Sequence, residues 1–185
     1  DMLTLRQAKG SDFSRMKVLI VGDVRHSRVA RTNLHALRAL GAGEIRVCGP
    51  APLLPEAGTT AGCVVGGDFD AMLEGVDAVM MLRLQRERME EGLVPSLEDY
   101  HARYGLTAAR LARAAPGAAV LHPGPINRGV EMTDEVADGP QSWVLRQVAN
   151  GVAVRMAVLE HLLGYAPPRR SVDRDGHRCR HRRGD

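Results

Sequence analysis

Short apolar runs alternate with segments of helical periodicity, and this alternation limits the fold more than any other feature of the chain. Four apolar runs are typical of buried strands: residues 17–21, 44–48, 76–82 and 118–121. The clearest helical pattern between them runs from Ser27 to Leu40. Strands that alternate with helices usually form one parallel sheet, because the crossover helices pack on its faces. We therefore predict an α/β fold, a parallel sheet with helices on both faces.

Further helices are predicted over 68–74, 96–104 and 107–115, with Asp68 as a plausible N-cap. The last predicted helix is the longest and spans Pro140 to Leu163, about 36 Å. Proline suits its first turn and Gly164 suits its end. Its predicted buried stripe consists of Val144, Val148, Val152, Met156, Leu159 and Leu163. The 185 residues suffice for one domain with a good-sized core.

The basic charge of the chain is concentrated at its end. Residues 166–185 contain seven Arg and three Asp, so removing their +4 from the formal +3 leaves the remainder near −1. This weakens a nucleic-acid interpretation of the domain itself, although an Arg/His tail that binds nucleic acid remains an alternative. Residues 165–185 have almost nothing apolar to bury, and we expect a disordered basic tail there.

The cysteines and the apolar runs exclude several classes of protein. Cys48, Cys63 and Cys179 are odd in number and far apart, which indicates neither a zinc site nor a disulfide framework. Reduced thiols favour a cytoplasmic protein. No apolar run approaches the length of a membrane span, and no signal peptide is visible, so no membrane association is expected.

Arg28 lies just past the first predicted strand, after the loop of residues 22–27, in the first turn of a helix. The helix dipole disfavours a cation there, so an arginine in this position often has an anion to bind. The alternative is a solvated surface arginine. The surrounding loop lacks a GxGxxG pattern, so we do not expect a nicotinamide or flavin site.

Arg83 and Gln85 follow the third predicted strand and alternate with Leu84, so their side chains can face one way. The alternative is a charged loop with local Glu87–Arg pairs. Because parallel strands present their carboxyl ends at one edge of the sheet, Arg83 and Arg28 are expected near each other. Two guanidinium groups suit a small substrate with two carboxylates.

The segment His122-Pro123-Gly124-Pro125 follows the fourth predicted strand. Two prolines restrict the backbone and leave carbonyl groups free to contact a ligand, while glycine permits close approach. A cis bond before one of these prolines is plausible. The alternative is simply a rigid turn, and we assign His122 no catalytic role.

Together these segments resemble the second half of the aspartate carbamoyltransferase family. The matching segments are residues 1–4 (DMLT), 22–33 (GDVRHSRVARTN), 83–88 (RLQRER), 122–131 (HPGPINRGVE) and Asn150-Gly151. Ornithine carbamoyltransferases instead have a Cys in the loop and a Ser-Met-Gly segment, which this chain lacks. The resemblance implies a Rossmann-like carbamoyltransferase second domain.

The resemblance also implies roles for individual residues. In that family, the residues that correspond to Arg28, Arg83 and Gln85 contact aspartate. Those that correspond to Gly124 and Pro125 bind carbamoyl phosphate through their backbone. No catalytic side chain, metal or cofactor is implied. The expected organisation is a remnant of the interdomain helix and linker over 1–16, the aspartate-binding domain over 17–139, its long C-terminal helix over 140–164, and the tail.

The family has a first domain whose Ser-Thr-Arg-Thr segment holds the phosphate, and this chain contains no such segment. We expect a missing N-terminal domain, in a fragment or a split enzyme, and by resemblance a homotrimer. The expected reaction transfers the carbamoyl group of carbamoyl phosphate to L-aspartate, giving N-carbamoyl-L-aspartate in pyrimidine biosynthesis. The alternative is a non-catalytic aspartate-binding fragment or pseudoenzyme half.

Overall fold

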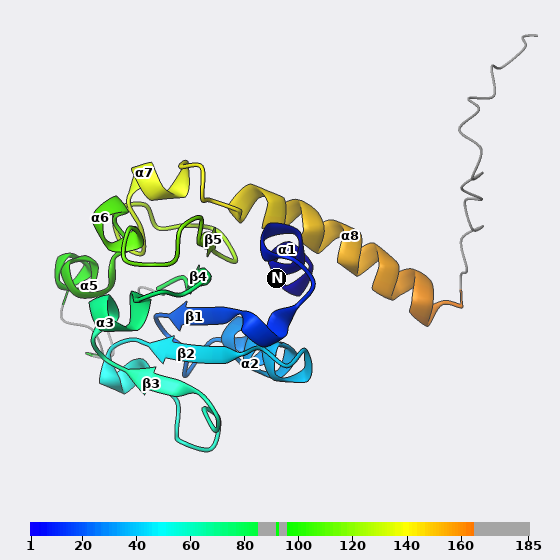
Figure 1. Cartoon of the computed structure of the whole chain (residues 1–185), viewed down its shortest axis with the longest axis horizontal. Coiled ribbons are helices and arrows are strands. Elements are labelled where there is room, and N and C mark those ends of the chain that lie inside the picture. Colours follow the sequence, from blue (N-terminus) through cyan, green and yellow to red (C-terminus); the bar gives the residue numbers. More distant parts are fainter. Residues whose placement is uncertain (85–91, 93–95, 165–185) are drawn as a thin grey trace, which may run out of the picture.

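A five-stranded parallel sheet forms the centre of the molecule (Figure 1). The computed structural model describes residues 1–84, 92 and 96–164. The strand order is β3-β2-β1-β4-β5, and every neighbouring pair is parallel. The strands are β1 (Lys17–Val21), β2 (Glu44–Cys48), β3 (Val64–Gly66), β4 (Ala78–Met81) and β5 (Ala119–Leu121).

Helices cover both faces of this sheet, as predicted. The α-helices are α1 (Met2–Lys9), α2 (Arg28–Ala39), α3 (Phe69–Leu73), α5 (Leu97–Tyr104), α6 (Ala108–Leu111), α7 (Asp134–Ala137) and α8 (Val144–Leu162). Two short 3₁₀ helices, η1 (Phe13–Arg15) and η2 (Ala51–Leu53), complete the described elements.

Alternating strand residues build two separate apolar cores. Leu19, Val79 and Val120 face one core, where they pack with residues of α3, α5, α6 and α7. Their neighbours Ile20 and Met80 face the other core, which includes residues of α1 and α2. Both faces of the sheet are thus buried, which explains why its strands are continuous apolar runs.

Side-chain caps begin α2 and α3, and the predicted cap at Asp68 is confirmed. The Ser27 side chain accepts a hydrogen bond from the N–H of Ala30 (3.1 Å), and Asp68 accepts one from Ala71 (3.1 Å). Such bonds satisfy backbone donors that have no partner within the helix. The cap at Ser27 sets the position of Arg28 as the first residue of α2.

An edge strand and the end of one helix differ from the predicted secondary structure. The short edge strand β3 was not predicted, because its Val-Val-Gly segment is short and follows a proline-rich stretch. The helix expected over 107–115 ends at Leu111, since Ala112–Ala118 turns back through the bonds Ala115 N–H to Val76 O and Ala118 N–H to Ala115 O.

The long C-terminal helix begins later than predicted, at Val144 rather than Pro140. Residues 141–143 pair with β5 through a parallel bridge between Ser142 and Val120: Val120 N–H donates to Gln141 O, and Trp143 N–H donates to Val120 O (both 2.8 Å). Backbone groups that pair with a strand cannot also form the first turn of a helix. Pro140 therefore lies in the preceding loop.

The predicted buried stripe of this helix is largely wrong. Val144 is buried, but the other members are exposed: Val148 54%, Val152 54%, Met156 57%, Leu159 58% and Leu163 82%. The buried residues of α8 are Val144, Gln147 and Asn150. Helix α8 packs beside α1 and then continues away from the sheet (Figure 1), so most of its length has no neighbour in the described part of the chain.

No helix in the described ranges is sufficiently long and apolar to span a membrane. The predicted tail, residues 165–185, lies outside the described residues.

Candidate functional site

Three segments meet at the carboxyl edge of the sheet, around the boundary between β1 and β4. The strand order reverses at this boundary, which is where open α/β sheets commonly bind ligands. A cavity of about 480 Å³ lies there. It is lined by Asp23, His26, Ser27, Arg28 and Val29 after β1, Leu82 and Arg83 after β4, and Pro123 and Gly124 after β5.

Arg28 and Arg83 line this same cavity, as their positions after two strands predicted. Both residues are exposed. The backbone N–H of Leu82 donates to Val21 O (2.8 Å), so the chain carrying Arg83 leaves the sheet in register with the end of β1. Gln85, the third residue expected to contact aspartate, lies outside the described residues.

Unlike Arg110 and Arg128, these two arginines have no carboxylate partner among the described residues. Arg128 is hydrogen-bonded to Asp134 (2.7 Å) and to Asp138 (2.7 and 2.8 Å), and its bonds to Asp138 lower the pKa of that carboxyl. Arg110 likewise bonds Asp70 (2.8 Å). The guanidinium groups at the cavity therefore have donors available for an anionic ligand.

The loop after β5 brings Gly124 to the cavity, whereas Pro125 is not among its lining residues. Gly124 has a φ of 72°, and the Gly124–Pro125 peptide bond is cis. The Gly124 N–H donates to Nδ1 of His122 (2.9 Å). Because that N–H is used within the loop, carbonyl groups are the contact the loop offers a ligand.

Asp23 and His26 also line the cavity, and sequence reasoning did not select them. A single oxygen of the buried Asp23 carboxylate accepts from the His26 backbone N–H (3.1 Å) and lies 2.8 Å from His26 Nδ1. These bonds fold the loop between β1 and α2 into a tight turn. Their position inside the matched 22–33 segment was the available signal, but only Arg28 was singled out there.

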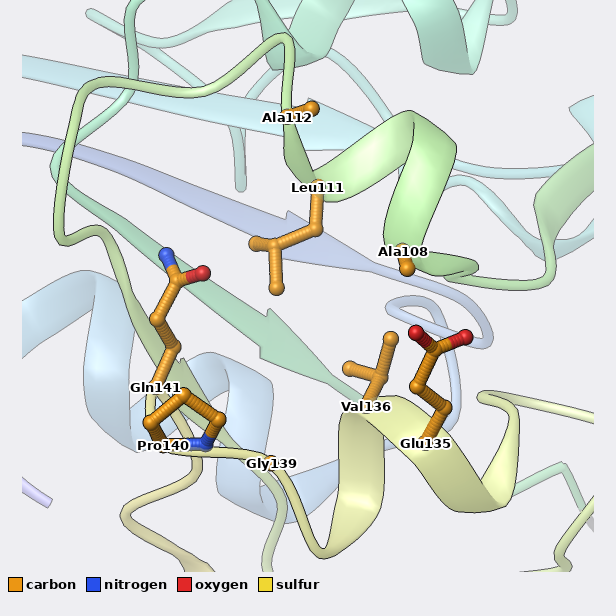
Figure 2. Close-up of a pocket in the computed structure, with 8 residues that line it drawn as sticks. All are labelled: Ala108, Leu111, Ala112, Glu135, Val136, Gly139, Pro140 and Gln141. Carbon is orange, nitrogen blue, oxygen red and sulfur yellow. The ribbon is translucent and has the colours of Figure 1, made fainter.

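Two other hollows lack this combination of charges. One of about 210 Å³ lies between α6 and α7, where Figure 2 shows Leu111 and Val136 projecting into it with the carboxylate of Glu135 at its rim. A wider one of about 810 Å³ lies after β2 and β3 and contains one arginine, Arg103, with Asp68. Neither brings two arginines together, so neither matches a dicarboxylate as well.

The described residues contain no cluster of His, Cys, Asp and Glu that could hold a metal ion. The cavity that contains Arg28 and Arg83 is suited to a small anion with two charged ends, which would lie beside a rigid backbone loop.

Known proteins are similar to this chain over most of its length. Residues 14–162 match the family described as "Aspartate/ornithine carbamoyltransferase, Asp/Orn binding domain". The aspartate carbamoyltransferase catalytic subunit of Stenotrophomonas maltophilia strain R551-3 is 85% identical over 164 residues, covering 89% of this chain and 52% of that protein. The subunit of the same name from Xylella fastidiosa strain 9a5c is 80% identical over 166 residues, covering 90% and 52%. The chain thus spans about half the length of the curated relatives it matches.

Solved structures show the same fold. Ornithine carbamoyltransferase from Pyrococcus furiosus aligns with a TM-score of 0.75 at 24% identity, covering 90% of this chain and 55% of that one. The Thermus thermophilus enzyme of the same name aligns with a TM-score of 0.75 at 25% identity, covering 88% and 53%. With the family match over most of its length and the parallel α/β fold in common, this chain belongs to the aspartate/ornithine carbamoyltransferase family.

Proposed function

We propose that this chain is the aspartate-binding part of an aspartate carbamoyltransferase. The observation that carries the proposal is that Arg28 and Arg83 line one cavity with the Pro123–Gly124 loop. Each arginine can donate two parallel hydrogen bonds to one carboxylate, so together they suit both ends of L-aspartate. Gln85 is proposed to add a further polar contact. Ornithine, whose side chain ends in an ammonium group, would be repelled by a second arginine.

The proposed reaction joins the α-amine of aspartate to the carbamoyl carbon of carbamoyl phosphate. The amine forms the new C–N bond, phosphate leaves, and the products are N-carbamoyl-L-aspartate, inorganic phosphate and a proton. The arginines would orient aspartate, and carbonyl groups near Gly124 and Pro125 would accept hydrogen bonds from the carbamoyl amide. Catalysis would then rest on positioning and on stabilising charge, with no side chain of this chain acting as nucleophile.

The proposal includes a partner that binds the phosphate. Relatives named as catalytic subunits are about twice the length that this chain matches. The apolar residues exposed along α8, such as Leu159 (58%) and Leu163 (82%), are suited to packing against a further domain. We propose that such a domain supplies the phosphate site, that the assembled enzyme is a homotrimer, and that it works in cytoplasmic pyrimidine biosynthesis.

A titration tests the substrate. The chain labelled with ¹⁵N is titrated with L-aspartate and, separately, with L-ornithine, and amide shifts are followed by NMR. We expect aspartate to shift the amides of Arg28 and Arg83 and ornithine to leave them unchanged. As a control, the Arg15→Ala variant should respond to aspartate like the wild-type chain. Arg15 is also exposed, but it precedes β1, at the opposite edge of the sheet. Equal responses to both amino acids would contradict the assignment to aspartate.

A second measurement separates an enzyme from a non-catalytic aspartate-binding half. The chain is mixed with a separately expressed carbamoyl-phosphate domain of a relative, and carbamoyl aspartate is assayed. Turnover by the mixture supports the proposed enzyme. Aspartate binding without turnover, in a mixture shown by sedimentation to assemble, supports the non-catalytic alternative.

A further inference from the structure

A buried carboxylate connects the two loops that carry the proposed ligand contacts. The side chain of Glu131 is fully buried. Its Oε1 accepts a hydrogen bond from the backbone N–H of Leu84 (2.8 Å), and its Oε2 accepts one from the backbone N–H of Asn127 (2.6 Å). Leu84 directly follows Arg83, and Asn127 lies two residues after Pro125. One carboxylate therefore holds backbone from both loops.

Asn127 closes the same connection with its side chain. Its Nδ2 donates to Glu131 Oε1 (2.8 Å) and to the carbonyl oxygen of Leu84 (3.0 Å). The N–H and the C=O of Leu84 are therefore both bonded to the segment that follows the Pro123–Gly124 loop. Leu84 is itself buried in the core, so the backbone beside Arg83 is restrained by packing and by hydrogen bonds.

His122 extends this hydrogen-bonded group of residues to Gly124. Its backbone N–H donates to Gln147 Oε1 (3.0 Å), and its Nδ1 accepts from the Gly124 N–H (2.9 Å). A neutral imidazole that accepts at Nδ1 carries its proton on Nε2. That Nε2 has no hydrogen-bond partner within the described ranges and lies 3.7 Å from Glu131 Oε2. His122, which bonds the backbone of Gly124, therefore lies beside Glu131, which bonds the backbone next to Arg83.

We infer that Glu131 is a positioning residue, which fixes Arg83 relative to the Pro123–Gly124 loop and so sets the distance between the two proposed substrate positions. The inference rests on the proposed function. Burying a carboxylate is costly, and pairs or networks of this kind are weak evidence for a gain in stability. Here each carboxylate oxygen satisfies a backbone donor from a different loop, which an apolar side chain of the same size cannot do.

The principal test is Glu131→Gln in the full chain. Glutamine keeps the shape but has one oxygen and one NH₂, so in either orientation its NH₂ faces a backbone N–H donor. We expect the affinity for L-aspartate, measured by NMR titration, to fall about 10- to 100-fold, because a buried donor loses its acceptor and the Arg83 segment is released. Hydrogen exchange of the Leu84 and Asn127 amides should become about tenfold faster or more.

Two matched controls separate positioning from general destabilisation. Glu135→Gln makes the same change at an exposed residue of α7, and should alter neither readout. Asn150→Ala removes buried hydrogen bonds between α8 and α1, away from the cavity, and should destabilise the fold without changing aspartate affinity. Should Glu131→Gln fail to fold, Asn127→Ala, which removes only the side-chain bonds, decides the question by the same readouts with smaller effects.

The inference is wrong if folded Glu131→Gln binds aspartate like the wild type. It is equally wrong if Asn150→Ala loses as much affinity, since the effect would then follow stability. A wild-type chain that does not bind aspartate contradicts the proposed function instead. In that case the exchange of Leu84 and Asn127, compared between Glu131→Gln and Asn150→Ala, still decides whether Glu131 connects the loops.

Discussion

Arginine residues in this protein differ in whether the fold already uses them. Arg46, for example, donates to the carbonyl oxygens of Met72 and Glu74 (2.8 and 2.9 Å), and so joins β2 to the end of α3. Arg28 and Arg83 have no such bond among the described residues, yet both line the cavity. The distinction matters because a guanidinium group that already has partners must exchange them before it can bind a ligand.

Substitution of Arg83 is therefore expected to affect the ligand more than the fold. Arg83→Ala removes two charge-assisted hydrogen bonds of about 1.5–3 kcal/mol each, roughly 3–6 kcal/mol together. In the chain assembled with a carbamoyl-phosphate domain, kcat/KM for aspartate should fall about 10²- to 10⁴-fold. Arg83→Lys should recover little, since an ammonium group cannot form the paired bonds. Near wild-type kinetics for Arg83→Ala would remove this residue from the site.

The two described cysteines should differ in reactivity. Burial, with a smaller contribution from the charge of Asp68, raises the pKa of the Cys48 thiol to about 12. A thiol alkylates as its thiolate, so at about pH 8 Cys48 should remain protonated and unreactive, and should react only as the pH rises toward its pKa. Partly exposed Cys63 should be modified by iodoacetamide under the same conditions. Peptide mass spectrometry measures the extent of labelling at each cysteine. Unfolding in urea should make the two cysteines equally reactive.

Residue-level prediction from the sequence succeeded where a signal is local. Strand ends and helix caps are local, and these placed Arg28 and Arg83 at one sheet edge. The role inferred for Glu131 is not local, because one of its hydrogen-bond partners is the backbone of Leu84, 47 residues away. Backbone partners leave no pattern of residue types, so sequence spacing alone cannot indicate them.

At the level of elements, periodicity predicted where strands and helices form better than it predicted which of their residues are buried. The apolar stripe of α8 is real as a sequence pattern, and the error was to assume that the same chain buries it. Such a stripe typically packs against another apolar surface. What anchors α8 here is polar: Asn150 Nδ2 donates to Thr4 Oγ1 (2.9 Å) and to Gln7 Oε1 (2.8 Å) on α1.

This anchor can be tested through stability. Asn150→Ala leaves the buried Thr4 Oγ1 and the more exposed Gln7 Oε1 of α1 without their donor, and should lower the free energy of unfolding by about 1–3 kcal/mol. Alanine's better helix propensity offsets only a part of this loss. Urea unfolding followed by circular dichroism measures the change. Arg155→Ala, at an exposed position of the same helix, should change stability by less than about 0.5 kcal/mol. Equal effects of the two substitutions would show that Asn150 does not anchor α8.

At the scale of the whole molecule, the fold and the proposed chemistry make different demands on the chain. With two apolar cores on the faces of one sheet, this chain is expected to fold alone. Carbamoyl transfer also requires the phosphate to be held, and no Ser-Thr-Arg-Thr segment is present in the sequence. The backbone proposed to contact carbamoyl phosphate, around Gly124 and Pro125, would offer only neutral contacts of about 1 kcal/mol each, well below the cost of immobilising a ligand.

We therefore expect the purified chain to unfold cooperatively but to form no carbamoyl aspartate when given both substrates. Adding a separately expressed carbamoyl-phosphate domain should produce turnover, because α8 then packs its apolar face and both substrates are held. Leu159→Glu provides the matched control: the side chain is exposed in the chain alone, so folding should be unchanged, whereas assembly and turnover should be lost. Turnover by the chain alone at an enzymatic rate would contradict the division of labour and would require a phosphate site within these 185 residues.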